Sequence, residues 1–382
     1  MKGSSDRILT THTGSLPRPT ELAALAEGRD QRQLSSDPTI TARVRGAVRD
    51  IVRKQIEVGV DIVNDGEMSK VGYSTYVSER LTGFSEQSRP MRPQVESRDF
   101  PEFYATRGPT SRNIQRPVCV GPIAWQGDAQ VQADISNLKA AVEGTSATEA
   151  FMSAASPGVV WHFLENDHYP THEQYVMAVA DAMNHEYKAI TDAGFVLQLD
   201  CPDLAMGWNR YSFADATLAD FRKVVELHVA AINHALDGVP ADRVRLHLCW
   251  GNFEGPHMRD VPLGQIFDIV QKARVSAFSF EGANPRHEHE WALFETVKPR
   301  EGTILIPGVL DSTTNFVEHP ELVAQRLVRY ANLVGKENVI AGTDCGFSTF
   351  ALAQPQVHPT ITWAKFQAMS EGARIASKKL WG

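Results

Sequence analysis

Short apolar runs recur along the chain, and between most of them apolar residues return every three or four positions. Such runs are typical of parallel strands that are covered on both faces. We predict eight strands, at residues 8–11, 60–63, 117–120, 195–199, 244–248, 277–280, 303–306 and 338–341. The stretches between them predict amphipathic helices at residues 40–58, 171–193, 218–236, 320–334 and 361–379. This alternation of strands and helices indicates an α/β protein with a parallel sheet.

Two architectures fit this alternation, an open doubly wound sheet and a closed (β/α)₈ barrel. Each predicted strand leads into a polar or Gly/Pro-rich segment at its C-terminal end. In a barrel these ends form one face, which is where barrel enzymes build their active sites. No repeat or shift in composition marks a second core. We therefore predict a single TIM-type (β/α)₈ barrel domain over residues 1–382, with long excursions after the second and third strands. The open sheet stays the alternative.

The composition is that of a globular protein, with 42% hydrophobic and 22% charged residues among 382. The formal charge of −8 argues against a general nucleic-acid binder, which usually carries a basic excess. No apolar run approaches the length needed to span a bilayer, and the polar N-terminal residues show no signal peptide, so we expect no membrane association and no secretion. Four cysteines in so long a chain suggest the reducing cytoplasm, where they are thiols or ligands rather than disulfides.

Two candidate metal ligands lie at the end of the strand predicted at residues 244–248. His247 and Cys249 are two positions apart, so in a strand their side chains point to the same face. Imidazole nitrogen and thiolate sulfur both bind zinc. A histidine packed beside a buried cysteine is the ordinary alternative. Two later strand ends add Glu281 and Cys345, which a barrel would bring to the same face.

His247, Cys249, Glu281 and Cys345 together offer one nitrogen, two sulfur and one oxygen donor, a set that suits tetrahedral zinc. Structural zinc sites usually use cysteine pairs that are close in sequence, whereas these ligands come from three separate strand ends. The carboxylate is the most replaceable ligand, so a substrate thiol could take its place. Zinc lowers the pKa of a bound thiol and so yields a thiolate nucleophile at neutral pH.

A second histidine pair competes with this set. His287 and His289 are also two positions apart, but they follow Pro285 in a predicted loop that leads into a helix. In that place they are more typical of a solvated or supporting role than of the metal site itself.

With these residues in view, the chain resembles the C-terminal catalytic domain of cobalamin-independent methionine synthase and the shorter single-domain members of that superfamily. The similarity runs from residues 12–19 to residues 342–346 and so covers most of the chain. The family's zinc motif is a His-x-Cys, a Glu at the end of the next strand and an Asp-Cys-Gly. The resemblance implies a barrel, zinc held by the four residues above, and alkyl transfer to a thiol.

The resemblance also implies residues that bind the substrates. Gly14 and Ser15 resemble the family's loop that contacts the thiol substrate. Glu67 and Asp200 resemble its two acids that bind the amino group of homocysteine. Trp125 resembles the tryptophan on which the family stacks its folate pterin. The ordinary alternative for these residues is a role in fixing loops or packing at the barrel rim.

Three departures from the family pattern limit what the resemblance implies. The sequence shows no N-terminal half that duplicates the barrel, as full-length methionine synthases have. Thr313 stands where the family has a catalytic histidine, and Met206 stands where it has a glutamate that helps to bind folate. Threonine cannot donate a proton near neutral pH as imidazole can. Another acid must do so, and Asp311, Asp203 and His257 are the candidates by position.

The leading hypothesis is a zinc-dependent thiol S-alkyltransferase that methylates homocysteine or a similar thiol, as in methionine biosynthesis. The methyl donor would be a simple folate or a methylated corrinoid protein. The alternative is thiol addition to an epoxide, as in epoxyalkane:coenzyme M transferase. A third hypothesis is a non-catalytic barrel that binds a small thiol or tetrapyrrole, since the related uroporphyrinogen decarboxylase barrels need no zinc. The expected partners are a small-molecule thiol and an alkyl donor, without nucleic acid or membrane, and homo-oligomerisation stays open.

Overall fold

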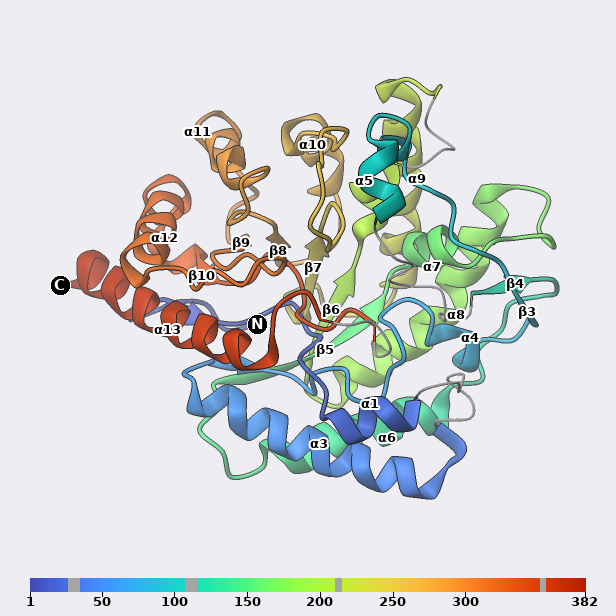
Figure 1. Ribbon diagram of the computed structural model, residues 1–382, viewed down its shortest axis with the longest axis horizontal. Helices are drawn as coiled ribbons and strands as arrows, with labels where there is room; N and C mark the ends of the chain where they lie inside the picture. Colours follow the sequence, from blue (N-terminus) through green and yellow to red (C-terminus); the bar gives the residue numbers. More distant parts are fainter. Residues whose placement is uncertain (27–34, 107–115, 210–214, 351–354) are drawn as a thin grey trace.

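The computed structural model describes residues 1–26, 35–106, 116–209, 215–350 and 355–382. Its centre is a six-stranded parallel sheet in the order β2-β5-β6-β7-β8-β9 (Figure 1). The strands are β2 Ile62–Val63, β5 Glu149–Ala155, β6 Val196–Asp200, β7 Val244–Leu248, β8 Ala277–Phe280 and β9 Ile304–Pro307. All of their residues except Glu149 are buried, as expected for a parallel sheet that helices cover on its outer face.

A two-stranded parallel pair lies between the two edges of this curled sheet. β1 (Leu9–Thr10) pairs with β10 (Ile340–Ala341). Isolated parallel bridges connect β9 with the segment around β10. On the other side, the backbone N–H of Asp61, just before β2, donates to the carbonyl oxygen of Thr10 at 3.1 Å. The predicted α/β class is confirmed, in the form of a curled six-stranded parallel sheet with this pair beside it.

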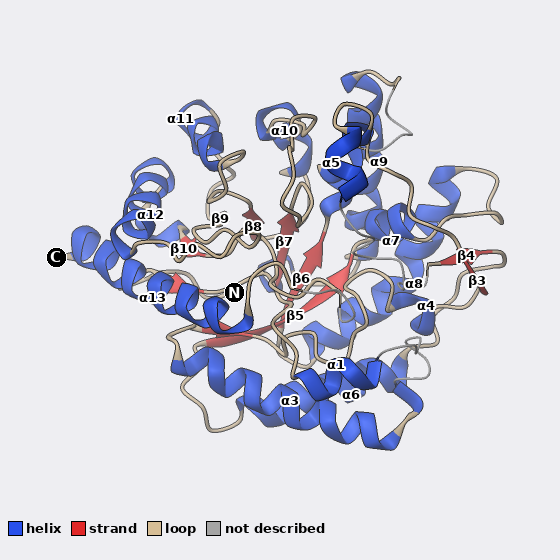
Figure 2. Ribbon diagram, viewed as in Figure 1, coloured by secondary structure: helices blue, strands red, loops and turns tan. Residues whose placement is uncertain are grey.

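The strand predicted at residues 117–120 is not part of the parallel sheet. β4 (Pro117–Cys119) pairs antiparallel with β3 (Phe84–Ser88) at the side of the molecule (Figure 2). The place next to β2 belongs instead to β5, which reads Glu-Ala-Phe-Met-Ser-Ala-Ala. β5 escaped prediction because three of its seven residues are alanine, which is uncommon in strands, and none is β-branched. The excursions predicted after the second and third strands are therefore one long connection between β2 and β5, from residue 64 to residue 148. Residues 107–115 of this connection lie outside the described residues.

Five long helices occur where the apolar periodicity predicts them, with ends within two residues of the prediction. They are α3 Pro38–Glu57, α8 His172–Asp192, α9 Leu218–Ala235, α12 Pro320–Val334 and α13 Pro359–Trp381. Side-chain caps fix their starts. The carboxylate of Asp37 accepts the backbone N–H of Thr39 at the start of α3, and Thr217 forms a capping box with Asp220 at the start of α9. A further long helix, α6 (Asp128–Val142), packs beside α3 (Figure 1).

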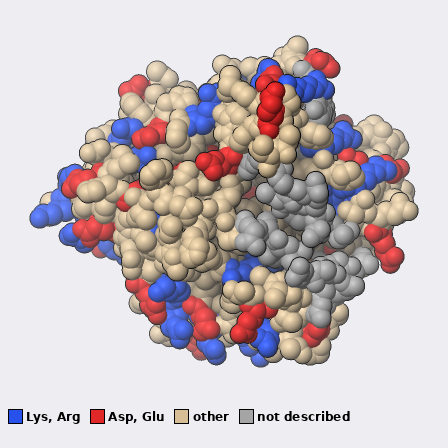
Figure 3. All heavy atoms as spheres, in the orientation of Figure 1, with Lys and Arg blue, Asp and Glu red and all other residues tan. Residues whose placement is uncertain are grey.

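Shorter helices fill the connections. They are α1 Thr20–Ala26, α4 Val77–Arg80, α5 Pro101–Thr106, α7 Pro157–Phe163, α10 Phe267–Val270 and α11 Leu293–Thr296. Among the described residues, no helix combines the length and the apolar character that crossing a bilayer requires. On the face drawn in Figure 3, basic and acidic side chains are interspersed.

Candidate metal centre and adjoining cavity

A cavity of about 370 Å³ lies at the C-terminal ends of the parallel strands. Polar residues that end or follow five of these strands line it: Ser15 after β1, Glu67 after β2, Asp200 in β6, His247 and Cys249 at the end of β7, and Cys345 after β10. Much of the remaining lining is apolar. A parallel sheet brings these residues together although they are far apart in sequence, because all its strands end on the same side.

Three of the four predicted metal ligands form one compact group. One ligand atom each of His247, Cys249 and Cys345 lies within 4.8 Å of the other two, and all three residues are buried. The Nδ1 atom of His247 contacts the hydroxyl of Ser279 at 3.2 Å. Its Nε2 atom is buried without a hydrogen-bond partner among the described residues. Metal-binding histidines share this arrangement, in which a neighbour holds one ring nitrogen and the other faces the ion.

The charge states of this group also suit a metal. Burial, aided by the charge of Arg245, lowers the pKa of His247 to about 3, so the imidazole is neutral and keeps a lone pair. The pKa of Cys249 is raised well above its ordinary value, first by its hydrogen bond with Cys345 and then by burial. The thiol of Cys249 therefore keeps its proton until a cation displaces it. One nitrogen and two sulfur donors fit zinc, which these three residues would hold.

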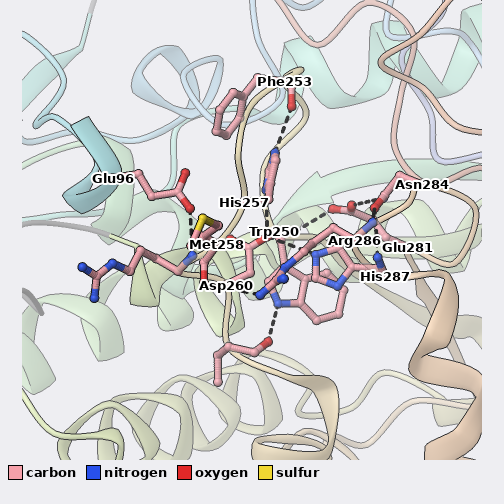
Figure 4. A network of polar contacts seen from close by, with 12 residues as sticks. Glu96, Trp250, Phe253, His257, Met258, Asp260, Glu281, Asn284, Arg286 and His287 are labelled. Atoms are coloured by element: carbon pink, nitrogen blue, oxygen red, sulfur yellow. Dashed lines mark hydrogen bonds and ion pairs between the residues drawn. The ribbon is translucent and has the colours of Figure 1, made fainter. Parts of the chain in front are cut away.

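The fourth predicted ligand, Glu281, is engaged by other partners. Its Oε1 atom accepts the backbone N–H of Trp250 at 2.7 Å, and its Oε2 atom accepts the side-chain amide of Asn284 at 2.7 Å (Figure 4). Glu281 lies outside the compact ligand group, but it is close enough for its charge to contribute to the raised pKa of Cys249. Three protein ligands with one open position are typical of catalytic rather than structural zinc sites.

Asp344, which is not among the residues predicted from the sequence to act at the site, organises the segment that holds Glu281. Its carboxylate accepts the backbone N–H groups of Gly282, Ala283 and Asn284, each at 2.8 Å, and the side-chain amide of Asn284 at 2.9 Å. Burial raises the pKa of Asp344 to about 7. Its place next to Cys345 was the available signal, but its partners come from another strand end.

The residues predicted to bind the thiol substrate gather at the same cavity. Ser15, Glu67 and Asp200 line it. Neighbouring Gly14 has a φ of 140°, and a Cβ added there would lie 2.7 Å from Oε1 of Glu67, so only glycine fits. Burial raises the pKa of both acids, and the charge of Glu67 raises that of Asp200 further. An ammonium group between the two carboxylates would relieve this repulsion.

The buried side chain of Arg245 holds Asp200 in place through Gln198. The side-chain amide of Gln198 donates to Oδ1 of Asp200 at 2.8 Å. The side-chain oxygen of Gln198 accepts a hydrogen bond from Nε of Arg245 at 2.9 Å. Arg245 is fully buried over the ring of Phe151 and donates to the hydroxyl of Thr11 at 3.0 Å. Burial lowers the pKa of Arg245 to about 9. This support is not predictable from the sequence, because the partners are far apart along the chain.

The three predicted proton donors, Asp311, Asp203 and His257, do not belong to the described lining of the cavity. Asp311 accepts the backbone N–H and the hydroxyl of Thr313, each at 2.8 Å. Asp203 is buried, and its carboxylate lies 2.7 Å from Nδ1 of His228. His257 adopts a left-handed φ of 52°. Asp311 and His257 thus bond within their own loops, the latter to Asp260 at 2.7 Å, and Asp203 bonds to helix α9.

Trp125, predicted to stack on a pterin, also lies outside the described lining. Its ring stacks on His185 with centroids 6.0 Å apart, and its indole N–H donates to Asp128 at 2.7 Å. The misplaced strand explains the difference. The segment that leads to Trp125 belongs to the β3–β4 pair and does not end at the face of the parallel sheet.

A second group of ligand-type atoms, from His257, Asp260 and His287, lies beside Trp250 (Figure 4). Oδ2 of Asp260 is 2.7 Å from Nδ1 of His257 and 3.0 Å from Nε2 of His287. The ring of His287 stacks on Trp250 with centroids 4.0 Å apart. Burial lowers the pKa of His287, but the hydrogen bond to Asp260 and the nearby carboxylate of Glu290 outweigh it and raise the pKa to about 10. Protons and ion pairs thus hold this group together. His287 supports the site, while His289 is exposed.

Comparison with known sequences identifies a family. The sequence profile described as "Cobalamin-independent synthase, Catalytic domain" matches residues 8–365. A methionine synthase of Pyrococcus furiosus is 23% identical over 338 residues, which cover 88% of this chain and 85% of that protein. A 2-hydroxypropyl-CoM lyase of Xanthobacter autotrophicus is 22% identical over 413 residues, which cover 100% of this chain and 98% of that protein.

A solved structure agrees with the fold. A B12-independent methionine synthase from a Shewanella species, in complex with selenomethionine, gives a TM-score of 0.73. The match covers 98% of this chain and 99% of that chain, at 22% identity. At this identity the likeness concerns the arrangement of helices and strands.

Proposed function

Because this chain belongs to the family of cobalamin-independent synthase catalytic domains, we propose that it is a zinc-dependent thiol S-alkyltransferase that methylates homocysteine or a similar amino-acid thiol. One observation carries the proposal: the buried group of His247, Cys249 and Cys345 lines the same cavity as Glu67 and Asp200. The first three residues offer ligands for a metal that binds sulfur, and the two acids offer a place for an amino group. A molecule that carries both a thiol and an amino group satisfies the two at once.

We further infer that the parallel strands close into one barrel and that residues 1–382 form a single catalytic domain. The β1–β10 pair, the bridges from β9 and the hydrogen bond between Asp61 and Thr10 support closure. Closure would also explain why the ends of β1, β2, β6, β7 and β10 meet at one cavity. Cys119, Cys201, Cys249 and Cys345 are free thiols, which accords with a reducing setting such as the cytoplasm.

In the proposed complex the thiol sulfur lies beside His247, Cys249 and Cys345. Zinc bound there would lower the pKa of the thiol and so supply a thiolate near neutral pH. Because Glu281 already binds Trp250, its carboxylate is held back from the position that the thiol needs.

The amino group of the thiol would bind between Glu67 and Asp200. The contact of Asp200 with Gln198, and of Gln198 with Arg245, keeps that carboxylate in one orientation. A substrate held at its sulfur and at its amino group has little rotational freedom, so the sulfur presents a fixed direction to the alkyl donor. We propose that Asp311 fixes a loop rather than donates a proton, since its carboxylate is taken up by Thr313.

Thiol addition to an epoxide is the second candidate, because the similarity to the 2-hydroxypropyl-CoM lyase covers 100% of this chain. The choice between the two candidates depends on the thiol. Coenzyme M carries a sulfonate, and no lysine or arginine belongs to the described lining of the cavity. Glu67 and Asp200 would repel a sulfonate and attract an ammonium group. This favours an amino-acid thiol, and a barrel that only binds small molecules would leave the ligand group without a purpose.

Zinc-edge X-ray absorption with two thiols tests the proposal. The protein, purified without chelators, should contain about one zinc ion per chain, as single catalytic sites do. Homocysteine should add a zinc–sulfur contact, and coenzyme M should not. Protein without zinc would refute the metal site, and a contact with coenzyme M alone would reverse the order of the two candidates.

A further inference from the structure

Aromatic rings form a large part of the cavity wall. Tyr73 and Phe163 lie edge to face with ring centroids 5.7 Å apart, and Tyr73 and Phe350 are 5.9 Å apart. Phe253 and Phe347 also line the cavity. Tyr73, Phe253 and Phe350 are only partly buried, so each keeps apolar surface that a ligand could cover. Rings in such a setting bind another ring edge-on or in an offset stack.

The charged residues at the cavity indicate which charge a second reactant can carry. Its described lining contains Glu67 and Asp200 but no lysine or arginine. Nearby Lys70 is buried and donates to the backbone oxygen of Ser153 at 2.6 Å. Among the described lining residues, a sulfonate, carboxylate or phosphate would meet the two acids and no cationic side chain. The described part of the cavity away from the metal ligands therefore disfavours an anionic reactant.

The size of the cavity sets a further limit. Its volume of about 370 Å³ is near the lower end of the range for pockets that hold drug-sized ligands, roughly 300–1,000 Å³. The thiol substrate takes up part of this space. The part of the second reactant that enters the cavity has to fit in the remainder, so that part is small.

We propose that the alkyl donor is a small, uncharged molecule that carries an aromatic ring, held against Tyr73, Phe253 and Phe350. This inference rests on the proposed thiol alkylation and names the class of its second substrate. In the reaction the sulfur forms a bond to the donor's alkyl carbon as the bond from that carbon to its leaving atom breaks. The leaving atom keeps the bonding electron pair and receives the proton that the thiol gave up, so atoms and charges balance.

Binding of two matched probes tests the inference without any chemistry. Benzamide and benzoate have the same ring and differ in charge. Saturation-transfer NMR would measure their affinities for the zinc-loaded protein in the presence of homocysteine. We expect benzamide to bind at least tenfold more tightly than benzoate. Equal or tighter binding of benzoate would overturn the inference.

A variant tests whether the rings provide the binding site. Phe350→Leu keeps apolar bulk but removes the ring, and we expect it to weaken benzamide about fivefold. Phe316→Leu is the matched control, because Phe316 is 84% exposed and lies outside the described lining, and it should change nothing. If thermal melting shows that Phe350→Leu is unfolded, Phe253→Leu takes its place in the experiment. Unchanged benzamide affinity in the folded variant would contradict the inference.

A reaction with iodomethane separates this inference from the proposed function. Iodomethane is neutral and has no ring, so it reports thiol activation alone. Alkylation of homocysteine without benzamide binding would refute the aromatic donor and leave the thiol chemistry standing. Benzamide binding without alkylation would refute the proposed function and leave the aromatic site standing. If the protein both binds benzamide and alkylates homocysteine, phenyloxirane should react with a kcat/KM at least tenfold above that of methyloxirane. A ratio near one would contradict the preference for a donor with an aromatic ring.

Discussion

The side-chain amide of Asn284 donates to Glu281 at 2.7 Å and to Asp344 at 2.9 Å. Asp344 precedes the ligand Cys345, so a single amide connects the two strand ends that carry the third and fourth predicted ligands. Hydrogen bonds to charged groups are worth about 1.5–3 kcal/mol each. Glu281 therefore cannot reach the ligand group without a substantial loss elsewhere.

Asn284→Ala removes this restraint. We expect the Oε2 atom of Glu281, which loses its partner, to compete with the thiol for the open metal position, which would raise the thiol KM about tenfold, equal to about 1.4 kcal/mol. Zinc content should stay unchanged, as measured by elemental analysis. Asn233→Ala is the control, because Asn233 binds Lys272 and Arg274 on the surface. A thiol KM equal to that of the wild type in Asn284→Ala would show that the amide does not restrain Glu281.

Removal of either ligand cysteine should abolish zinc binding. Cys249→Ala and Cys345→Ala leave only two ligands each, too few for a stable zinc site. We expect both variants to lose zinc and alkyl transfer while their circular dichroism stays that of the wild type. Cys119→Ala, a buried cysteine outside the ligand group, should keep its zinc. A full complement of zinc in either ligand variant would refute the assignment.

Local pattern predicts part of the fold and of the site. The spacing of His247 and Cys249 places two side chains on one face of a strand, and helical periodicity gives the ends of five helices within two residues. β5 was missed because it is rich in alanine and has no β-branched residue, so burial in the sheet rather than propensity makes it a strand. The error carried over to Trp125, which was assigned to the wrong strand end.

The orientation of acidic side chains depends on partners that sequence spacing does not reveal. Glu281 turns to the backbone of Trp250, and Asp203 pairs with His228. These contacts join residues more than twenty positions apart, so the sequence predicts which acids lie near the cavity but not which of them face it. Arg245 is a further case, since a buried arginine beneath a binding site is recognisable only from its partners.

Neutralising the acid pair should affect only thiols that carry an amino group. We expect Glu67→Gln and Asp200→Asn each to raise the KM for homocysteine about 10- to 100-fold, because a hydrogen bond to a charged group of about 1.5–3 kcal/mol is lost. The KM for butanethiol, which has no amino group, should stay unchanged. Steady-state kinetics with both thiols provide the measurement. A parallel rise for butanethiol would mean that the two acids shape the cavity rather than bind an amino group.

The buried His287 should make the stability of the protein depend on pH. Its pKa is about 10 in the folded chain and about 6.5 in an unfolded one. Between these values the folded state holds a proton that the unfolded state has lost. The stabilisation is therefore complete below about pH 6.5 and decreases as pH rises toward 10.

Urea unfolding of the wild type and of His287→Gln at pH 7 and pH 9 measures this effect. Glutamine cannot titrate, so the variant should lose up to about 1.4 kcal/mol less per pH unit than the wild type over this interval. His289→Gln, at an exposed position two residues away, should keep the slope of the wild type. Parallel slopes for the wild type and His287→Gln would mean that His287 is neutral in the folded state. The contact of its Nε2 atom with Asp260 would then be a neutral hydrogen bond rather than an ion pair.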